Sequence, residues 1–179
     1  MTLAEYFDTA ETMLPQELIY GAIRVADAPF VGHQRVVLRL ALALQDHVEQ
    51  WGAGEVLVAP TDVILDADRN LVLQPDLLFV SRERSSIVRE RVYGAPDLVI
   101  EVLSPRPRIG ALDERVRWFA ECGVGEIWLY DQDRRVMRVL QCADGGVQGS
   151  TVFEPGDIIQ SDVLPEFRRS VRSVVAGPL

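Results

Sequence analysis

Hydrophobic residues recur along the chain with two different periods, which predict a mixture of helices and strands. In HQRVVLRLALALQDHVEQWG (33–52), apolar residues return every three or four positions from Val37 to Val48. This spacing predicts an amphipathic helix, and Gly52 supplies its expected end. Short apolar segments bounded by turn residues predict strands, and ELIYGAIRVAD (17–27) has the pattern of a hairpin.

The order of the remaining elements predicts the fold class. A strand from about Asp97, a helix over 109–122 and a strand over 125–131 follow one another. We therefore expect a parallel pair of strands joined by a crossover helix. The other expected elements are a helix over 3–12 and strands over 55–60, 62–70, 71–80, 134–141 and 149–157, the last two as an antiparallel pair. The predicted fold is α/β or α+β, with a mixed β-sheet flanked by helices.

Length and composition indicate an ordinary globular protein. The 179 residues, with 48% hydrophobic and 25% charged side chains, suit a single domain over 1–179. No apolar run approaches the roughly 18 residues of a membrane span. The first residues, MTLAEYFDTAETM, carry acids where a secretory signal is basic. Cys122 and Cys142 match no zinc spacing and predict packing roles in a reducing setting, so we expect a cytoplasmic protein.

The net charge of −9 restricts the classes of partner. Indiscriminate nucleic-acid binding depends on clustered positive charge, which this composition disfavours. A metal-dependent site is compatible with it, because a bound divalent ion changes the local sign of charge. The Lys+Arg total of 18 consists of arginine alone, since the chain contains no lysine.

The segment LVIEVL (98–103) places Glu101 in the middle of an apolar strand. A carboxylate buried alone costs several kcal/mol or becomes neutral, so Glu101 needs a partner. Asp97 lies on the same strand face but about 13 Å away at roughly 3.3 Å per residue, which is too far to share one ion. Asp76, in QPDLLFV, would lie about 5 Å from Glu101 at Cβ if the two strands were neighbours in register. Two such carboxylates repel each other unless a cation such as Mg²⁺ bridges them.

These residues resemble a known motif. A Pro-Asp pair, then Glu101-x-Leu103 on the next strand and a basic residue on the following helix, is similar to the PD-(D/E)XK nuclease superfamily. More narrowly, PDLVIEVLSP followed by ECGVGEIWLYD resembles the Uma family of predicted restriction endonucleases. QELIYGAIRV and HQRVVLRLALAL are similar to the N-terminal segments of that family. The resemblance covers nearly the whole chain and implies a restriction-endonuclease-like fold.

The resemblance also implies a site and a reaction. Asp76 and Glu101 would be the ligands of Mg²⁺ or Mn²⁺, and the main-chain carbonyl of Val102 a further ligand. The metal would polarise a phosphodiester of DNA and help to generate the attacking hydroxide. Arg115 matches the helix position from which the family supplies its catalytic lysine, where a cation stabilises charge on the phosphate. Glu17 matches a glutamate of the family, and the resemblance implies a supporting role for it. The expected function is metal-dependent cleavage of DNA by an endonuclease.

Several positions depart from the family pattern. Leu103 stands where the superfamily motif has lysine, and Arg115 stands where the Uma family has it. Arginine stays protonated and its planar fork needs more room, so the exchange predicts a site that binds metal with weakened or absent activity. Because the whole chain lacks lysine, general residue usage explains the arginine equally well. Ala22 and Ala111 replace acidic residues of the pattern.

Two alternatives to an active nuclease stay open. One is a nuclease-fold protein that binds or regulates without cutting, and the other is a dimeric interaction module whose acids are structural. DNA is the expected partner as substrate, a homodimer is a further candidate assembly, and no membrane association is expected. His33 is better explained as the start of a helix than as a metal ligand, and His47 as a solvated or interface residue.

Overall fold

The computed structural model describes residues 1–9, 14–103 and 111–176. No helix in these ranges is both long and apolar enough to cross a membrane. In chain order, the helices are α1 (Leu3–Phe7), α2 (Val31–Trp51), the 3-10 helix η1 (Arg82–Ile87), α3 (Leu112–Glu121) and α4 (Val171–Val175). The strands are β1 (Gln16–Ile19), β2 (Ala22–Val25), β3 (Gly54–Val58), β4 (Val63–Asp66), β5 (Leu71–Leu73), β6 (Leu77–Ser81), β7 (Val92–Tyr93), β8 (Leu98–Leu103), β9 (Glu126–Asp131), β10 (Val136–Ala143) and β11 (Gly146–Phe153).

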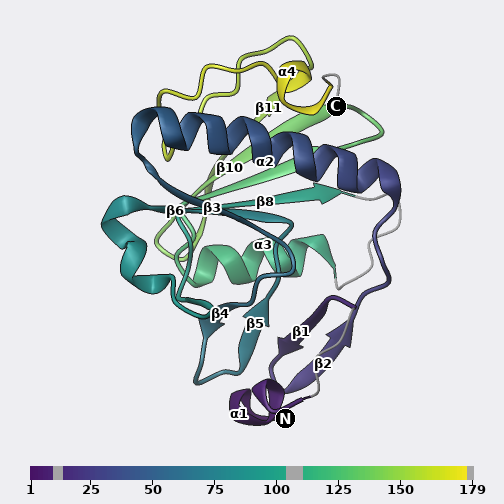
Figure 1. Cartoon of the computed structure of the whole chain (residues 1–179), viewed down its shortest axis with the longest axis vertical. Coiled ribbons are helices and arrows are strands. Elements are labelled where there is room, and N and C mark those ends of the chain that lie inside the picture. The colour runs from purple at the N-terminus through teal and green to yellow at the C-terminus, as the bar shows by residue number, and fades with distance from the viewer. Residues whose placement is uncertain (10–13, 104–110, 177–179) are drawn as a thin grey trace.

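The large sheet has the strand order β11–β10–β9–β8–β6–β3. β8 and β9 are parallel and α3 lies between them in the chain, which confirms the expected crossover unit. The other neighbours are antiparallel: β10 pairs with β9 and β11, and β6 pairs with β8 and β3. The sheet is therefore mixed, as expected, and Figure 1 shows its strands alongside α2.

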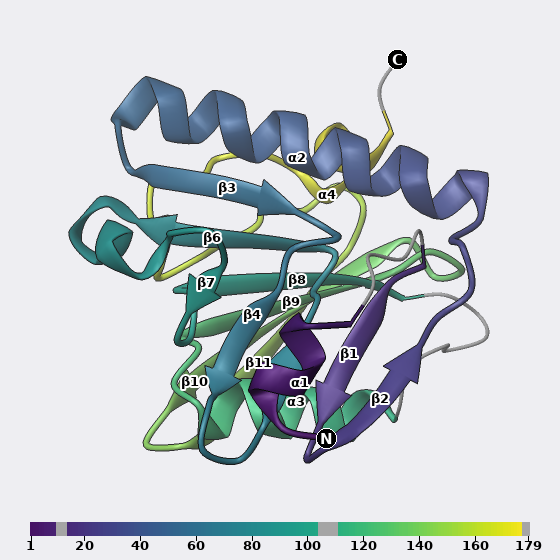
Figure 2. The same cartoon turned by 60° about the horizontal axis from the view of Figure 1, so that its bottom comes forward.

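The small sheet has the strand order β2–β1–β5–β4–β7 and lies below the large sheet in Figure 1. Figure 2 shows the hairpin of β1 and β2 at the front, beside α1. This hairpin is the one expected from the sequence, with Tyr20 and Gly21 in its turn at φ values of 51° and 88°. Positive φ at both turn residues matches the twist of the strands, and glycine adopts it at little steric cost.

Residues 71–80 do not form the continuous strand that the sequence predicts. β5 ends at Leu73 in the small sheet and β6 begins at Leu77 in the large sheet. The chain therefore changes sheets at residues 74–76, called here the crossing segment. Pro75 lacks the N–H that a strand ladder needs, which explains a break at this point. Both halves are apolar and buried, and a hydrophobic pattern does not record which sheet a strand joins.

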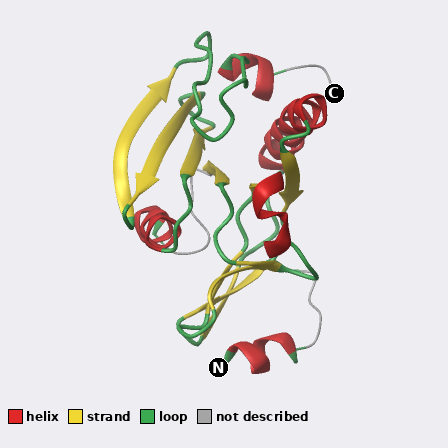
Figure 3. Cartoon of the chain, turned by 90° about the vertical axis from the view of Figure 1, so that its left-hand side faces the viewer, coloured by secondary structure: helices red, strands yellow, loops and turns green. Residues whose placement is uncertain are grey.

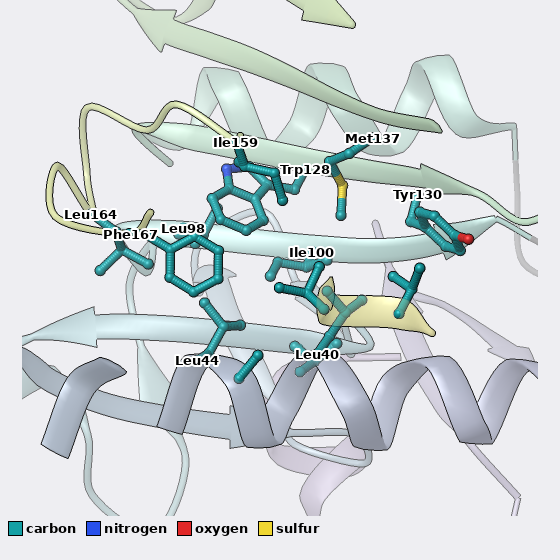
Figure 4. Close-up of a cluster of buried hydrophobic side chains, with 14 of the residues drawn as sticks. Leu40, Leu44, Leu98, Ile100, Trp128, Tyr130, Met137, Ile159, Leu164 and Phe167 are labelled. Carbon is teal, nitrogen blue, oxygen red and sulfur yellow. The ribbon is translucent and has the colours of Figure 1, made fainter. Parts of the chain in front are cut away.

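Helices cover both faces of the large sheet, as Figure 3 shows from the side. Alternate residues of β8 point into two separate buried clusters, one beneath α2 and one beneath α3. In the first cluster, Leu40 and Leu44 of α2 lie against Ile100, Trp128 and Phe167 (Figure 4). The mixed sheet flanked by helices that the sequence predicts is confirmed.

The helix ends agree with the sequence to different degrees. Gly52 closes α2 in the left-handed conformation, at φ 59°, and its N–H donates to the carbonyl of Val48. The predicted end of the long helix is therefore confirmed. α1 ends at Phe7, earlier than expected, and residues 10–13 lie outside the described residues. α3 is confirmed over Leu112–Glu121, while positions 109 and 110 also lie outside them.

Candidate active site

Glu101 lies in β8, and Asp76 immediately precedes β6, the neighbouring strand of the large sheet. β6 and β8 are antiparallel, with Leu77 opposite Ile100. Continuing this register by one residue puts Asp76 opposite Glu101, and opposite residues on one face of an antiparallel pair are about 5 Å apart at Cβ. β6 and β8 are thus in the register on which the predicted pairing of Asp76 with Glu101 depends. Asp76 is the last residue of the crossing segment, so the pair also lies next to the small sheet.

Asp76 is held through one of its two oxygens. Oδ2 accepts the main-chain N–H of Val102 at 2.7 Å and lies 3.1 Å from Nε2 of His33. Among the described residues, none donates a hydrogen bond to Oδ1. The side chain is 19% exposed, so Asp76 is held by described residues through one oxygen while the residue is partly open to solvent.

Glu101 is also held through one oxygen. Oε1 accepts two bonds from Arg115, from Nη2 at 2.6 Å and from Nε at 3.1 Å. No described residue donates to Oε2. Burial raises the pKa of Glu101 to about 7, with Arg115 opposing the change and the charge of Asp76 adding to it. The carboxylate therefore lies where a second negative charge is unfavourable and a cation would be favourable.

Arg115 connects Glu101 to Glu17. Nη1 of Arg115 donates to both carboxylate oxygens of Glu17, at 2.8 and 2.7 Å, and Glu17 is fully buried in β1. Glu17 accepts a third bond from the main-chain N–H of Gln74 at 2.7 Å. Burial alone would lower the pKa of Arg115, but the two glutamates raise it above its ordinary value, so the guanidinium stays charged. It also lies over the ring of Phe119, at 5.7 Å from the centroid.

At three positions this chain has an uncharged residue where the family pattern has a charged one, namely Leu103, Ala22 and Ala111. The carbonyl of Leu103, at the superfamily lysine position, accepts the side-chain amide of Gln132 at 2.9 Å. Ala22 is exposed in β2, and Ala111 is the N-cap residue of α3 without a side-chain bond. Among the residues that the structure describes, Arg115 is the cation that bonds to Glu101.

Asp97 has a structural role at the start of β8. Its Oδ2 accepts the N–H of Ser81 at 2.8 Å, and its Oδ1 accepts from Arg84 at 3.2 Å. These bonds tie β8 to the end of β6 and the beginning of η1. Asp97 is therefore engaged at the start of β8, away from Glu101, as the strand rise between the two residues predicts. Asp76, and not Asp97, lies opposite Glu101.

The donor set fits a hard divalent cation. Asp76 and Glu101 each leave one carboxylate oxygen without a protein donor, counting the described residues. Mg²⁺ is commonly held by one or two carboxylates together with waters and substrate phosphates. Across residues 1–9, 14–103 and 111–176, no group of three or more His, Cys, Asp or Glu side chains is arranged to enclose a metal.

His33 also lies at this site, although its sequence position predicts only the start of a helix. It does lie in the first turn of α2, as expected, yet its ring nitrogen also reaches Asp76. The sequence does carry a signal for it. His33 is four residues before Val37 and so continues the apolar stripe of α2, where a polar residue needs a specific partner.

Comparisons with known proteins identify a family and a similar fold. The model of the Uma2 family, described as "Putative restriction endonuclease", matches residues 3–172. A protein from Anabaena variabilis whose crystal structure is described as that of "a putative nuclease" is similar with a TM-score of 0.82 and 20% sequence identity, over 98% of both chains. No curated protein matches the sequence. The structural likeness confirms the restriction-endonuclease-like fold, and the family match indicates a nuclease.

Proposed function

Because the chain belongs to the Uma2 family, we propose that it is a metal-dependent endonuclease that hydrolyses phosphodiester bonds in DNA. Asp76 and Glu101 are the proposed ligands of Mg²⁺ or Mn²⁺. Arg115 is the proposed catalytic cation, and Glu17 supports it. Residues 1–179 are proposed to form a single domain of this fold.

One observation carries the proposal. Asp76, just before β6, lies opposite Glu101 of β8 when the strand register is continued by one residue, and each is fixed through one oxygen while the other accepts no hydrogen bond from a described residue. The raised pKa of Glu101, about 7, reflects burial and the nearby charge of Asp76. A divalent cation held by Asp76 and Glu101 would stabilise both carboxylates in their charged form.

The residues of the chain have distinct tasks in this proposal. When bound, the divalent ion would polarise the phosphate and lower the pKa of a water molecule. Asp76 and Glu101 would hold that ion, because Val102 and Arg115 fix the orientation of the two carboxylates. Arg115 lies beside Glu101, where its charge would stabilise the negative charge that grows on phosphorus oxygens. The water oxygen bonds to phosphorus while the bond to a sugar oxygen breaks, and that oxygen takes up a proton.

Arg115 limits the expected rate. Its guanidinium already donates to Glu17 and Glu101, so its charge is shared with two carboxylates before any phosphate arrives. Arginine also does not exchange a proton with water at neutral pH. We therefore propose slow cleavage, and a nuclease-fold protein that binds DNA without cutting it is the rival that the experiments must separate.

The proposed function is tested by nicking of supercoiled plasmid in Mg²⁺ or Mn²⁺. Wild-type protein should nick the plasmid, and Asp76→Asn and Glu101→Gln should not. Asp97→Asn is the matched control, because Asp97 also follows a proline at the entry to a strand but bonds to Ser81 and Arg84. It should nick like wild type at a temperature where it is folded. Equal nicking by all four proteins would identify a contaminating nuclease and remove the proposal.

Arg115→Lys separates slow catalysis from none. A lysine ammonium is compact and exchanges protons with water, so this variant should nick faster than wild type if the cation is the limiting group. The comparison is made at saturating Mn²⁺, with Mn²⁺ binding measured on the same preparations. Bound Mn²⁺ without any nicking in either protein would favour the non-catalytic rival.

A further inference from the structure

The buried face of α2 begins with a histidine where the helix pattern predicts an apolar side chain. His33 is 8% exposed and lies on the same face as Val37, Leu40, Leu44 and Val48. Burying an imidazole costs free energy unless its polar atoms are hydrogen-bonded, whereas a leucine at this position would extend the core. The choice of histidine is therefore explained by what it bonds to.

The ring bonds to the proposed metal ligand Asp76. Nε2 of His33 lies 3.1 Å from Oδ2 of Asp76, and the same oxygen accepts the N–H of Val102 at 2.7 Å. An ionised carboxylate only accepts hydrogen bonds, so the ring nitrogen facing Oδ2 carries a proton. That nitrogen has no lone pair to offer a metal in this arrangement. Two donors, one from α2 and one from β8, fix a single oxygen of Asp76.

We propose that His33 is a positioning residue of the metal site, which fixes Asp76 through Oδ2 so that Oδ1 is the oxygen that binds the divalent cation. The inference rests on the proposed function, since it assumes a cation at Asp76 and Glu101. Hydrogen bonds to the far side of a metal ligand set its orientation, and losing such a partner typically weakens metal binding by about 10- to 100-fold. A purely structural histidine would leave metal affinity unchanged.

The chain contains two histidines, and the second is a matched control. His47 is also buried on α2 and packs edge-on against Phe167, about 21 Å further along the helix at 1.5 Å per residue. We compare Mn²⁺ binding to the full chain without DNA, by calorimetry, for wild type, His33→Leu and His47→Leu. His33→Leu should bind Mn²⁺ about 10- to 100-fold more weakly. His47→Leu should bind like wild type, and His33→Gln, whose amide can donate to Asp76, should lie between wild type and His33→Leu.

A second measurement on the wild-type protein needs no substitution at His33. With two histidines, NMR spectra of the imidazole nitrogens contain two sets of signals, which His47→Leu assigns. We expect the proton of the His33 ring on Nε2, and substoichiometric Mn²⁺ should broaden the His33 signals far more than those of His47. A His33 ring without a proton on Nε2 would overturn the inference even if His33→Leu failed to fold.

The outcomes distinguish the inference from the function on which it rests. Equal Mn²⁺ affinity in wild type and folded His33→Leu would overturn the positioning role and leave the nuclease proposal intact. No Mn²⁺ binding by the wild-type protein would overturn both. Weaker Mn²⁺ binding by His33→Leu, with unchanged unfolding temperature and an unaffected His47→Leu control, would support the role of His33 whether or not plasmid is nicked.

Discussion

Replacing Arg115 by methionine should destabilise the fold by about 3–5 kcal/mol, because it removes the cation from a buried ion cluster. Glu17 is fully buried, and the side chains of Arg115 and Glu101 are 9% and 13% exposed. Without the guanidinium, the main-chain N–H of Gln74 is the remaining donor to Glu17 among the described residues, and Glu101 loses the two bonds that Arg115 donates. Methionine keeps much of the volume of the arginine stem, so the loss reports the charges more than the packing.

Urea unfolding at pH 7.5 in the presence of EDTA measures this loss without interference from metal. A parallel thermal scan should show a midpoint lower by roughly 6–20 °C, at 2–4 °C per kcal/mol for a domain of this size. Arg117→Met is the matched control on the same helix. Its side chain is 59% exposed and lies 3.8 Å from Glu121, so its loss should cost less than about 1 kcal/mol.

The second substitution Glu17→Gln identifies the source of the loss. In the Arg115→Met background it removes a buried negative charge that has lost its cation, so it should restore part of the stability. In the wild-type background the same change removes an ion-pair partner of Arg115 and should destabilise. A loss below about 1 kcal/mol for Arg115→Met, or additive effects of the two substitutions, would refute the buried ion cluster as a determinant of stability.

Two further predictions concern residues outside this cluster. Asp97→Ala should lower the free energy of unfolding by about 1–3 kcal/mol, because the N–H of Ser81 loses its acceptor, and should leave the Mn²⁺ affinity measured by calorimetry unchanged. Weaker Mn²⁺ binding would place Asp97 in the site instead. Burial, with the charge of Arg169, lowers the pKa of His47, so the unfolded chain takes up a proton first as pH falls below about 6.5. Lowering pH from 7.5 to 5.5 should therefore destabilise wild type more than His47→Gln in urea unfolding; equal pH dependence would contradict the buried neutral histidine.

The elements that the sequence predicts well are those whose signals are local. The apolar period of α2 and its terminal Gly52 depend on neighbours in the chain, and both agree with the structure. The division of 71–80 between two sheets is different, because LVL and LLFV have equally buried, apolar side chains. Which sheet each joins depends on partners such as β1 and β8, which lie far away in the sequence.

The site shows the same limit. Glu101 was recognisable because an acid in an apolar strand needs a partner, and Asp76 because strand register offered one. That Arg115 would hold Glu17 was beyond the sequence, since 98 residues separate them. The resemblance to a family indicates which residues belong to the candidate site. The ion cluster that joins Glu17, Glu101 and Arg115 is seen only in the structure, where β1, β8 and α3 pack together.

The crossing segment has a consequence for how the two sheets hold together. Gln74, at its start, donates to Glu17 of the small sheet, and Asp76, at its end, accepts from Val102 of the large sheet. Arg115 adds a third link between the sheets, because it bonds to both Glu17 of the small sheet and Glu101 of the large sheet. The sheets therefore cannot separate without pulling the candidate ligands out of place. The same hydrogen bonds hold the two sheets together and orient the carboxylates of Asp76 and Glu101. A substitution that weakens the contact between the sheets should therefore also change the orientation of these carboxylates.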